Sequence, residues 1–354
     1  MTTVRTAADN AALAQLACLL EVSAPKPGNV SPGRHFADLT YEDFLTSAVA
    51  IGPAFTRVAD QSLGATIRQA IEMTACWTKT NTNLGIVLLL APLAKAATMG
   101  GGGELRGALH RVLDETTVED ARDVYAAIRR ASPGGLGRAE TQDVASEPDV
   151  TLLEAMRLAA GRDGIAREYE TRFAVTFEHG APTLTQARAD GLSWSDAVVE
   201  TYLSLLARSL DTHIVRRTGA AAAERVSAQA REVLAAGGVR SAAGRQAVEE
   251  MDRAMRDARN SNNPGTTADL TAAAIFVTLV SSEGLHARCI PRFGDERLSG
   301  LRLGALHYVR RASLRRTARP QLSRARDHRR RSQPGELVRV RLCRAEAHHE
   351  AAVR

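Results

Sequence analysis

The sequence predicts an all-α fold, and three observations lead to that prediction. The 354 residues include 44% hydrophobic residues, mostly Ala, Leu and Val, but only 4% aromatic residues, a composition that suits packed helices better than sheets. Apolar residues recur at helical spacing over residues 1–282, with no sustained strand alternation. There is no hairpin signal and no repeat of fixed period. We therefore expect a single multi-helix globular bundle.

The helices can be placed in order along the chain. The first carries an apolar stripe, including Leu13 and Leu20, and ends before Pro25. The run at 84–97 is apolar nearly all round, as expected of a central buried helix. Residues 100–103 are a glycine-rich connection and residues 131–148 a surface loop. The other helices are expected at about 41–55, 63–78, 104–113, 117–131, 150–160, 163–178, 193–210, 219–236, 241–259 and 266–281.

Charge is unevenly distributed along the chain. The formal net charge is +6, yet residues 283–354 carry 18 arginines, no lysine and 7 acidic residues, which leaves residues 1–282 with a net charge of −5. An arginine-rich tail can contact nucleic-acid phosphates. A disordered appendage or a frame-shifted end is the alternative, and the abrupt loss of lysine favours it. We therefore expect a helical domain at 1–282, an unstructured tail at 283–354 and no nucleic-acid partner.

The compartment is predicted from cysteines and apolar runs. The four cysteines are scattered, with no ligand spacing and no disulfide framework. The N-terminus reads as an amphipathic helix rather than a signal peptide. The apolar run at 84–97 is too short to span a bilayer. These features predict a soluble cytoplasmic protein and leave its oligomeric state open.

The first of four polar clusters is EVSAPKPGNV (21–30), at the end of the first helix. Glu21 lies in the last helical turn, where the helix dipole disfavours a carboxylate. Lys26 stands between two prolines, beside Gly28 and Asn29, where a fixed ammonium could hold a phosphate. An ordinary helix stop with a solvated lysine explains the same residues equally well.

The second cluster is KTNTNLG (79–85), directly before the most apolar helix. Either Thr82 or Asn83 would be a good N-cap, and free N–H groups at a helix start can bind an anion. Capping accounts for one asparagine but not for both Asn81 and Asn83. The segment from Asn81 to Gly85 is therefore a candidate nucleotide site.

The third cluster is DTHIVRR (211–217), where His213 and Arg216 would share a helix face. Asp211 together with ATP phosphates could hold Mg²⁺, which needs only one or two carboxylates. The cluster offers too few ligands for a metal site made by protein alone.

The fourth cluster is NSNNPGTTAD (260–269). Thr266 and Asp269 have the spacing of a capping box, so structure alone could require them. The preceding loop, with Asn262 and Gly265, exceeds what a cap needs.

Familiar nucleotide and hydrolase motifs are absent from the sequence. It has no GxxxxGK[ST], no GxGxxG after a strand, no GxSxG, no HExxH and no DDxxD pair. An all-helical protein that handles nucleotide phosphates without a P-loop belongs to a restricted class.

Five segments together resemble the triphosphoribosyl-dephospho-CoA synthase family: EVSAPKPGNV, FADLTYEDFLTSAVAIGP, KTNTNLGIVLLLAPL, DTHIVRRTG and NSNNPGTTADLTAAAIF. They occur in the family's order, and the resemblance covers roughly residues 10–281. It implies an all-helical transferase that joins the ribose of ATP to 3′-dephospho-CoA, expels adenine and keeps the triphosphate. The matching positions are Glu21, Lys26, Gly28, Asn81, Gly85, Asp211, Gly265 and Asp269.

Roles follow if the clusters converge on one cleft. Expelling adenine builds positive charge at the ribose C1′, and a carboxylate could stabilise that charge or deprotonate the attacking hydroxyl. Glu21 or Asp211 is the expected catalytic carboxylate, and Mg²⁺ is expected between the nucleotide and Asp211 or Asp269. The expected substrate-binding residues are Lys26, Gly28, Asn29, Asn81, Asn83, Gly85, His213, Arg216, Asn262 and Gly265.

The sequence also departs from the family pattern. Where the family has a motif like NTHKG, residues 81–85 read NTNLG, and the usual DTN reads DTH at 211–213. These changes keep two alternatives open: ribosyl or phosphoribosyl transfer to another acceptor, such as a pterin or furan C1 carrier, and a helical protein that binds a nucleotide without turnover. Release of adenine from ATP would distinguish an enzyme from the latter.

Overall fold

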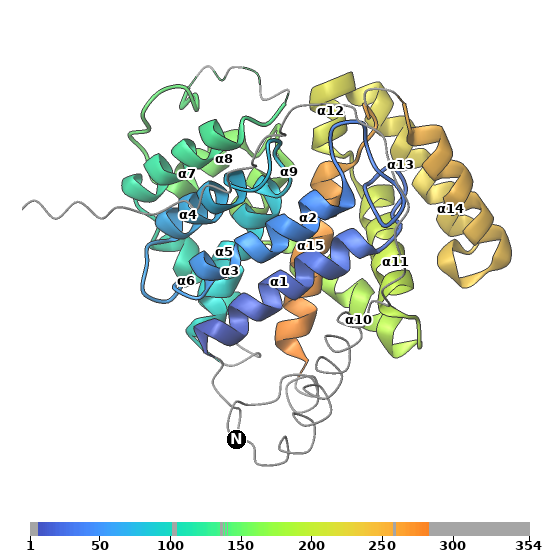
Figure 1. The fold of residues 1–354 in the computed structure, drawn as a ribbon, viewed down its shortest axis with the longest axis horizontal. Coiled ribbons are helices and arrows are strands. Elements are labelled where there is room, and N and C mark those ends of the chain that lie inside the picture. Colours follow the sequence, from blue (N-terminus) through green and yellow to red (C-terminus); the bar gives the residue numbers. More distant parts are fainter. Residues whose placement is uncertain are drawn as a thin grey trace, which may run out of the picture. The chain divides into compact units, whose positions relative to one another are not determined.

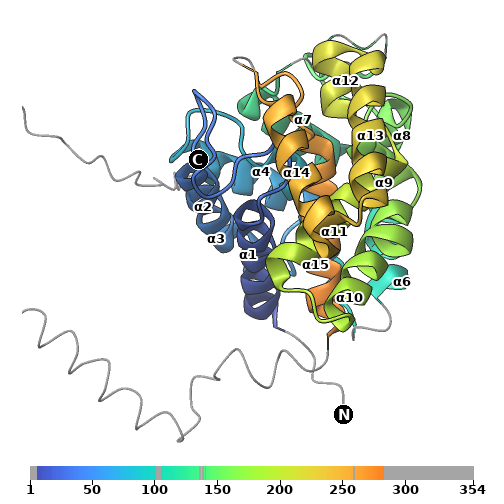
Figure 2. The same ribbon diagram turned by 90° about the vertical axis from the view of Figure 1, so that its right-hand side faces the viewer.

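The computed structural model describes residues 6–100, 105–134, 137, 139, 141–257 and 260–282. Within these residues the chain is helical and has no β-strand, apart from an isolated bridge between Ser31 and Arg34 (Figures 1 and 2). The all-α prediction is confirmed. The predicted tail, 283–354, lies outside the described residues, and so does most of the glycine run at 100–103.

Two apolar helices form the centre of the bundle, α5 (Leu84–Thr98) and α15 (Gly265–Ser281). They pack against each other, and α15 also contacts α1 (Ala7–Ser23), α10 (Ala181–Ala189) and α11 (Trp194–Arg208). Nearly every residue of α5 and α15 is buried. The prediction of a central helix at 84–97 is therefore correct, and α15 has the same surroundings.

The remaining helices surround this pair. The helices on one side all come from the first half of the chain: α2 (Tyr41–Ala50), α3 (Gly52–Phe55), α4 (Leu63–Ala75), α6 (Leu105–Asp114), α7 (Val118–Ala131), α8 (Leu152–Ala159) and α9 (Gly164–Glu170) (Figure 1). The other side has α12 (Thr212–Thr218), α13 (Ala220–Ala235), a short 3₁₀ turn (Gly238–Arg240) and α14 (Ala242–Met255). No helix of the described part combines the length and apolarity needed to cross a membrane.

One predicted helix is wrong in its extent. The periodicity suggested a continuous helix at 163–178, but the chain leaves α9 at Thr171, where Arg172 and Phe173 have positive φ angles of 57° and 60°. The buried carboxylate of Glu168 stabilises this break by accepting hydrogen bonds from the backbone N–H groups of Val175 and Thr176. A π-helical turn (Thr176–Gly180) then leads directly into α10, which the sequence did not predict.

Candidate active site

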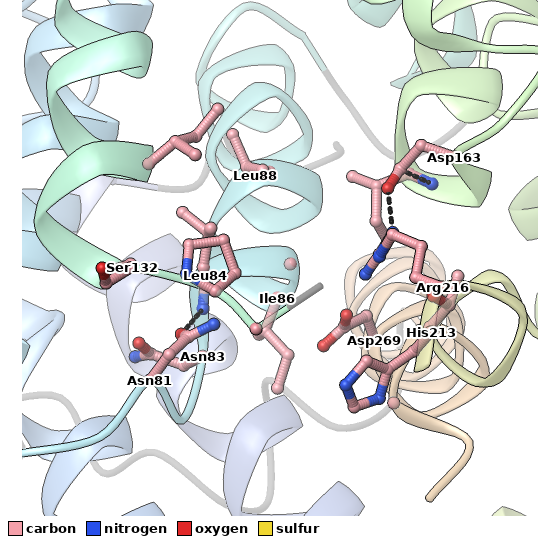
Figure 3. Close-up of a pocket in the computed structure, with 18 of the residues that line it drawn as sticks. Asn81, Asn83, Leu84, Ile86, Leu88, Ser132, Asp163, His213, Arg216 and Asp269 are labelled. Carbon is pink, nitrogen blue, oxygen red and sulfur yellow. Dashed lines mark hydrogen bonds and ion pairs between the residues drawn. The ribbon is translucent and has the colours of Figure 1, made fainter. Parts of the chain in front are cut away.

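A large cavity of about 1300 Å³ lies where the first turns of α5, α9, α12 and α15 meet the end of α1 (Figure 3). All four predicted polar clusters contribute to its lining. The predicted residues on its wall are Glu21, Asn29, Asn81, Asn83, Gly85, His213, Arg216, Gly265 and Asp269. Four others, Lys26, Gly28, Asp211 and Asn262, are not on the wall.

Glu21 and Lys26 form a buried ion pair at the end of α1. The Lys26 ammonium Nζ lies 2.9 Å from Glu21 Oε1, and both side chains are almost completely shielded from solvent. The ammonium also donates to the backbone carbonyls of Ala24, at 3.2 Å, and Glu21. With its donors used inside the turn, Lys26 does not fit the predicted contact with a phosphate. It neutralises Glu21 instead, and Glu21 alone reaches the cavity.

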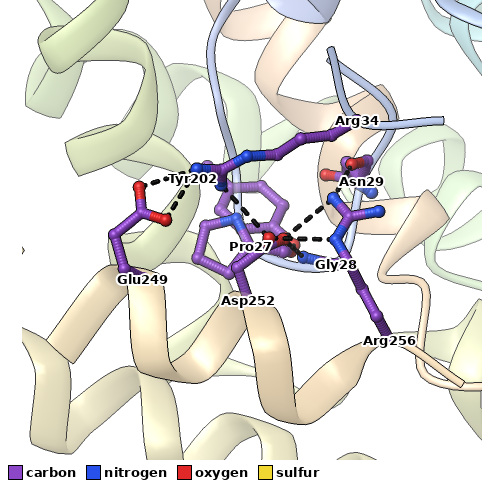
Figure 4. A network of polar contacts seen from close by, with 8 residues as sticks. All are labelled: Pro27, Gly28, Asn29, Arg34, Tyr202, Glu249, Asp252 and Arg256. Atoms are coloured by element: carbon purple, nitrogen blue, oxygen red, sulfur yellow. Dashed lines mark hydrogen bonds and ion pairs between the residues drawn. The ribbon is translucent and has the colours of Figure 1, made fainter. Parts of the chain in front are cut away.

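The turn after Lys26 is held by hydrogen bonds to side chains of α11 and α14. Gly28 has a φ of +76°, and a Cβ there would lie 2.7 Å from Met255 Cε, so glycine is required. Its N–H donates to Asp252 Oδ1 at 2.8 Å. Tyr202 Oη donates to the carbonyl of Pro27 at 2.7 Å (Figure 4). Gly28 is thus a structural residue rather than a phosphate contact.

Asp252 is the centre of this network, and no sequence pattern indicated its role. Besides Gly28, its carboxylate accepts from Arg34 Nη1 at 3.1 Å and from Arg256 Nε at 2.9 Å (Figure 4). Arg34 also pairs with Glu249. Asp252 lies in the regular helix α14, where local sequence cannot reveal a partner more than 200 positions away.

Asn29 brings this turn to the cavity. Its Nδ2 donates to Asn263 Oδ1 at 2.6 Å, which joins the first polar cluster to the fourth. The neighbouring Asn263 carbonyl lies 3.1 Å from His213 Nδ1, which links in the third cluster. Asn262 is not part of the lining, and its backbone carbonyl oxygen would lie 3.4 Å from a Cβ on Gly28.

The two asparagines before α5 have separate tasks. Asn81 Oδ1 accepts a hydrogen bond from Leu84 N–H at 3.1 Å, so Asn81 caps the helix. Asn83 occupies the N-cap position of the backbone but makes no capping bond with its side chain, contrary to prediction. Its Nδ2 donates to Thr74 Oγ1 at 3.2 Å. Its Oδ1 has no partner within the described residues.

Asp269 projects from α15 towards the start of α5 (Figure 3). The predicted capping box is absent, since α15 begins after Pro264 without any side-chain cap. A Cβ on Gly85 would come within 2.0 Å of Asp269 Oδ2, so only glycine leaves room for this carboxylate. Burial, reinforced by the charges of Glu21, Asp211 and Asp163, raises the pKa of Asp269 well above its ordinary value.

Asp211 joins two helices and does not face the cavity. Its Oδ1 accepts from the backbone N–H groups of His213 and Ile214 as the N-cap of α12. Its Oδ2 accepts from the N–H and the hydroxyl of Thr267 on α15, at 2.7 and 2.8 Å. Both oxygens are occupied, so the geometry does not support the predicted catalytic or Mg²⁺-binding role. Burial raises the pKa of Asp211.

Cationic and imidazole groups from α12 lie beside Asp269 (Figure 3). Arg216 pairs with Asp163, which caps α9 and was missed by the sequence analysis (Figure 3). Arg216 Nε has no partner within the described residues. Burial lowers the pKa of His213, against the opposing effect of Asp211. His213 is therefore neutral at pH 7, and Arg216 supplies positive charge at this wall.

A protein-only metal centre does not form in the described part of the chain, which has no group of three or more His, Cys, Asp or Glu side chains able to hold an ion. Asp269 is the one predicted metal ligand on the cavity wall, and none of the described residues donates a hydrogen bond to its carboxylate. One carboxylate suits Mg²⁺ that takes its other ligands from water and phosphates.

The geometry defines a class of protein. Two long helices begin at one cavity, and N–H groups at helix starts together with an arginine favour a polyanion. Two carboxylates, Glu21 and Asp269, stand beside them. An all-helical body with this site and without a P-loop fits an enzyme that acts on a phosphorylated nucleotide.

Comparison with known proteins identifies the family. Residues 7–287 match the family model described as ATP:dephospho-CoA triphosphoribosyl transferase. A Pseudomonas putida protein described as a probable 2-(5″-triphosphoribosyl)-3′-dephosphocoenzyme-A synthase is 30% identical over 278 residues, which cover 77% of this chain and 94% of that protein. A Stutzerimonas stutzeri protein described in the same words is 29% identical over 271 residues, covering 72% and 85%.

A solved structure agrees with these sequence matches. The crystal structure of an Archaeoglobus fulgidus protein, described as a triphosphoribosyl-dephospho-CoA synthase, superposes with a TM-score of 0.54 at 28% identity and covers 67% of this chain and 99% of that one. The chain belongs to the ATP:dephospho-CoA triphosphoribosyl transferase family. It is a triphosphoribosyl transferase, as the resemblance predicted.

Proposed function

We propose that the cavity is the active site and that it holds ATP and dephospho-CoA together. In the reaction, the bond between ribose C1′ and adenine breaks, and a bond forms between C1′ and a hydroxyl oxygen of dephospho-CoA. The hydroxyl proton leaves with adenine, and the triphosphate stays on the transferred ribose. The observation that carries the proposal is the meeting of Glu21, Gly85 and Asp269 from three distant segments on one wall.

The triphosphate would bind where α5 and α15 begin. Both helices are long, with 15 and 17 residues. Asn81 already accepts from Leu84 N–H and Asp211 from Thr267 N–H, so the triphosphate would bind the other N–H groups of the two first turns. Partial positive charge at a helix start favours phosphate. Arg216, held in place by Asp163, adds a full positive charge near Asp269.

Asp269 is the best candidate for moving the proton. A carboxyl group with a raised pKa is a better proton acceptor than an ordinary aspartate once it is ionised. In this role Asp269 would take the proton from the attacking hydroxyl. Glu21, which forms an ion pair with the buried Lys26 ammonium, would stabilise positive charge that develops at C1′.

Mg²⁺ would be held by Asp269 and by the phosphates of ATP, with Asp211 excluded by its four hydrogen bonds. When bound there, the ion would neutralise phosphate charge. Its positive charge would also favour the ionised form of Asp269, which burial otherwise disfavours.

The test is adenine release from ATP in the presence of dephospho-CoA, followed by mass spectrometry. Asp269→Asn should lower the rate by about 100- to 10,000-fold, the range for losing a general base, and Glu21→Gln should also lower it. Glu178→Gln removes an exposed ion pair with Arg106 outside the cavity and serves as the matched control. Wild-type rates in folded Asp269→Asn protein would contradict the assignment.

A further inference from the structure

One side of the cavity is apolar and has no task in the steps described so far. It lies between α7 and α8, which pack together. Val124 and Ile128 line it from α7, and Leu152, Ala155 and Met156 line it from α8. Leu158, at the end of α8, is also on the wall and is 59% exposed.

This side is built as a fixed wall. The segment after α7 is tied back onto the helix: Tyr125 Oη donates to the carbonyl of Gln142 at 2.7 Å, and Arg129 Nη1 donates to the carbonyl of Val144 at 2.8 Å. Asp143 accepts from the N–H of Ala145 at 2.9 Å. The apolar surface therefore exists before any ligand arrives, as in most small-molecule sites.

The cavity has more room than one nucleotide needs. Pockets for a single small ligand commonly occupy roughly 300–1000 Å³, whereas this cavity has about 1300 Å³. Asp269, Asp163 and Arg216 lie on the side formed by α9, α12 and α15 (Figure 3). The side chains that α7 and α8 themselves add to the wall are mainly apolar, although Asp143 and Arg162, in the segments after these two helices, also belong to the lining.

We propose that the apolar wall between α7 and α8 binds the pantetheine arm of dephospho-CoA; this rests on the proposed function of the cavity. The triphosphate and the ribose of ATP are polar and match the charged side. Of the two substrates, only dephospho-CoA carries a long uncharged chain. The wall thereby selects an acceptor that carries the arm.

The experiment measures binding rather than turnover, so it is independent of catalysis. Calorimetry gives the Kd of dephospho-CoA and of ADP, which keeps the acceptor's nucleotide but lacks the arm. Leu158→Glu and Ile128→Asn should each raise the Kd of dephospho-CoA by about tenfold, the effect of disturbing one apolar contact, and should leave the Kd of ADP as in the wild type. Val49→Glu, an exposed apolar position on α2 outside the cavity, is the matched control and should change neither.

Two results would overturn the inference. Equal weakening of ADP and dephospho-CoA would place the nucleotide part, not the arm, on the apolar wall. Wild-type affinity for dephospho-CoA in both variants would show that the arm does not touch it. If wild-type protein binds dephospho-CoA with the expected preference over ADP but releases no adenine, the proposed function fails while this inference stands.

Discussion

At the scale of single residues, the site is a group of carboxylates whose ionised forms are disfavoured by desolvation and by one another's negative charge. Asp269 is half-buried on the cavity wall, and its pKa is raised by desolvation and by the charges of Glu21, Asp211 and Asp163. Only Glu21 has a buried cation as its direct partner. Strongly perturbed groups in a cavity are typical of functional sites, and they should reveal themselves in stability measurements.

Asp269 should make the folded protein less stable as pH rises. Because its pKa is higher in the folded than in the unfolded state, the folded state binds more protons between the two values, so its contribution to stability falls as pH increases through that window. Asp269→Asn should remove this loss and raise the Tm at neutral pH. Thermal unfolding from pH 4 to 8 tests it. A Tm difference between variant and wild type that shrinks with rising pH would contradict the account.

Lys26 should be required for stability because of Glu21. Lys26→Met leaves a buried carboxylate without its ion-pair partner, which costs about 3–5 kcal/mol in comparable buried pairs. Urea unfolding measures the loss. The double variant Glu21→Gln, Lys26→Met should recover part of it, since no unpaired charge remains. If the single and double variants were equally unstable, the ion pair would not explain the effect.

Gly85 should matter for activity more than for folding. Gly85→Ala places a methyl group 2.0 Å from Asp269 Oδ2 and must displace that carboxylate. A shift of about 1 Å in a reacting group can cost 100-fold in rate. Gly107→Ala is the matched control, because Gly107 is also helical and a Cβ there meets nothing within 4 Å. Adenine release and Tm should separate the two: Gly107→Ala keeps the rate and gains stability.

At the scale of elements, buried carboxylates connect neighbouring segments by accepting hydrogen bonds from their backbone N–H groups. Asp211 connects α12 to α15, Asp252 connects the turn after α1 to α14, and Glu168 closes the break after α9. Each of these carboxylates holds in place a segment that carries a residue of the cavity wall. These aspartates and glutamates therefore position the site without facing it.

Asp211→Ala should lower stability rather than act on the chemistry directly. Four donors lose their acceptor, and each buried unsatisfied donor costs about 1–3 kcal/mol. Thermal unfolding should show a large drop in Tm, with His213 and the start of α15 losing protection from hydrogen exchange. Full stability combined with lost adenine release would instead restore Asp211 as a catalytic residue.

The elements themselves could be predicted where periodicity is strong. The central helix at 84–97 and the capping boxes at Thr40 and Thr117 depend on local sequence, and local rules describe them. The break at Arg172 and the helix α10 could not be predicted, because Glu168 stabilises them through contacts that periodicity does not encode.

At the scale of the whole molecule, the sequence placed the four polar clusters at helix ends, and the fold brings them to one cavity. The sequence could not show which of the polar residues line the cavity. In the sequence, Lys26 and Asp211 cannot be distinguished from Asn81 and Asp269. Only the packing of α1, α12 and α15 shows that the first two make internal contacts and that the other two line the cavity. The partners Asp163 and Asp252 were missed for the same reason.

Locating bound ATP decides whether this cavity holds the nucleotide. In a crystal structure with ATP and Mg²⁺, the triphosphate should lie within hydrogen-bond distance of the first turns of α5 and α15, with the ribose beside Asp269. A nucleotide bound elsewhere, with Glu21, Asp269 and Arg216 out of its reach, would contradict the account.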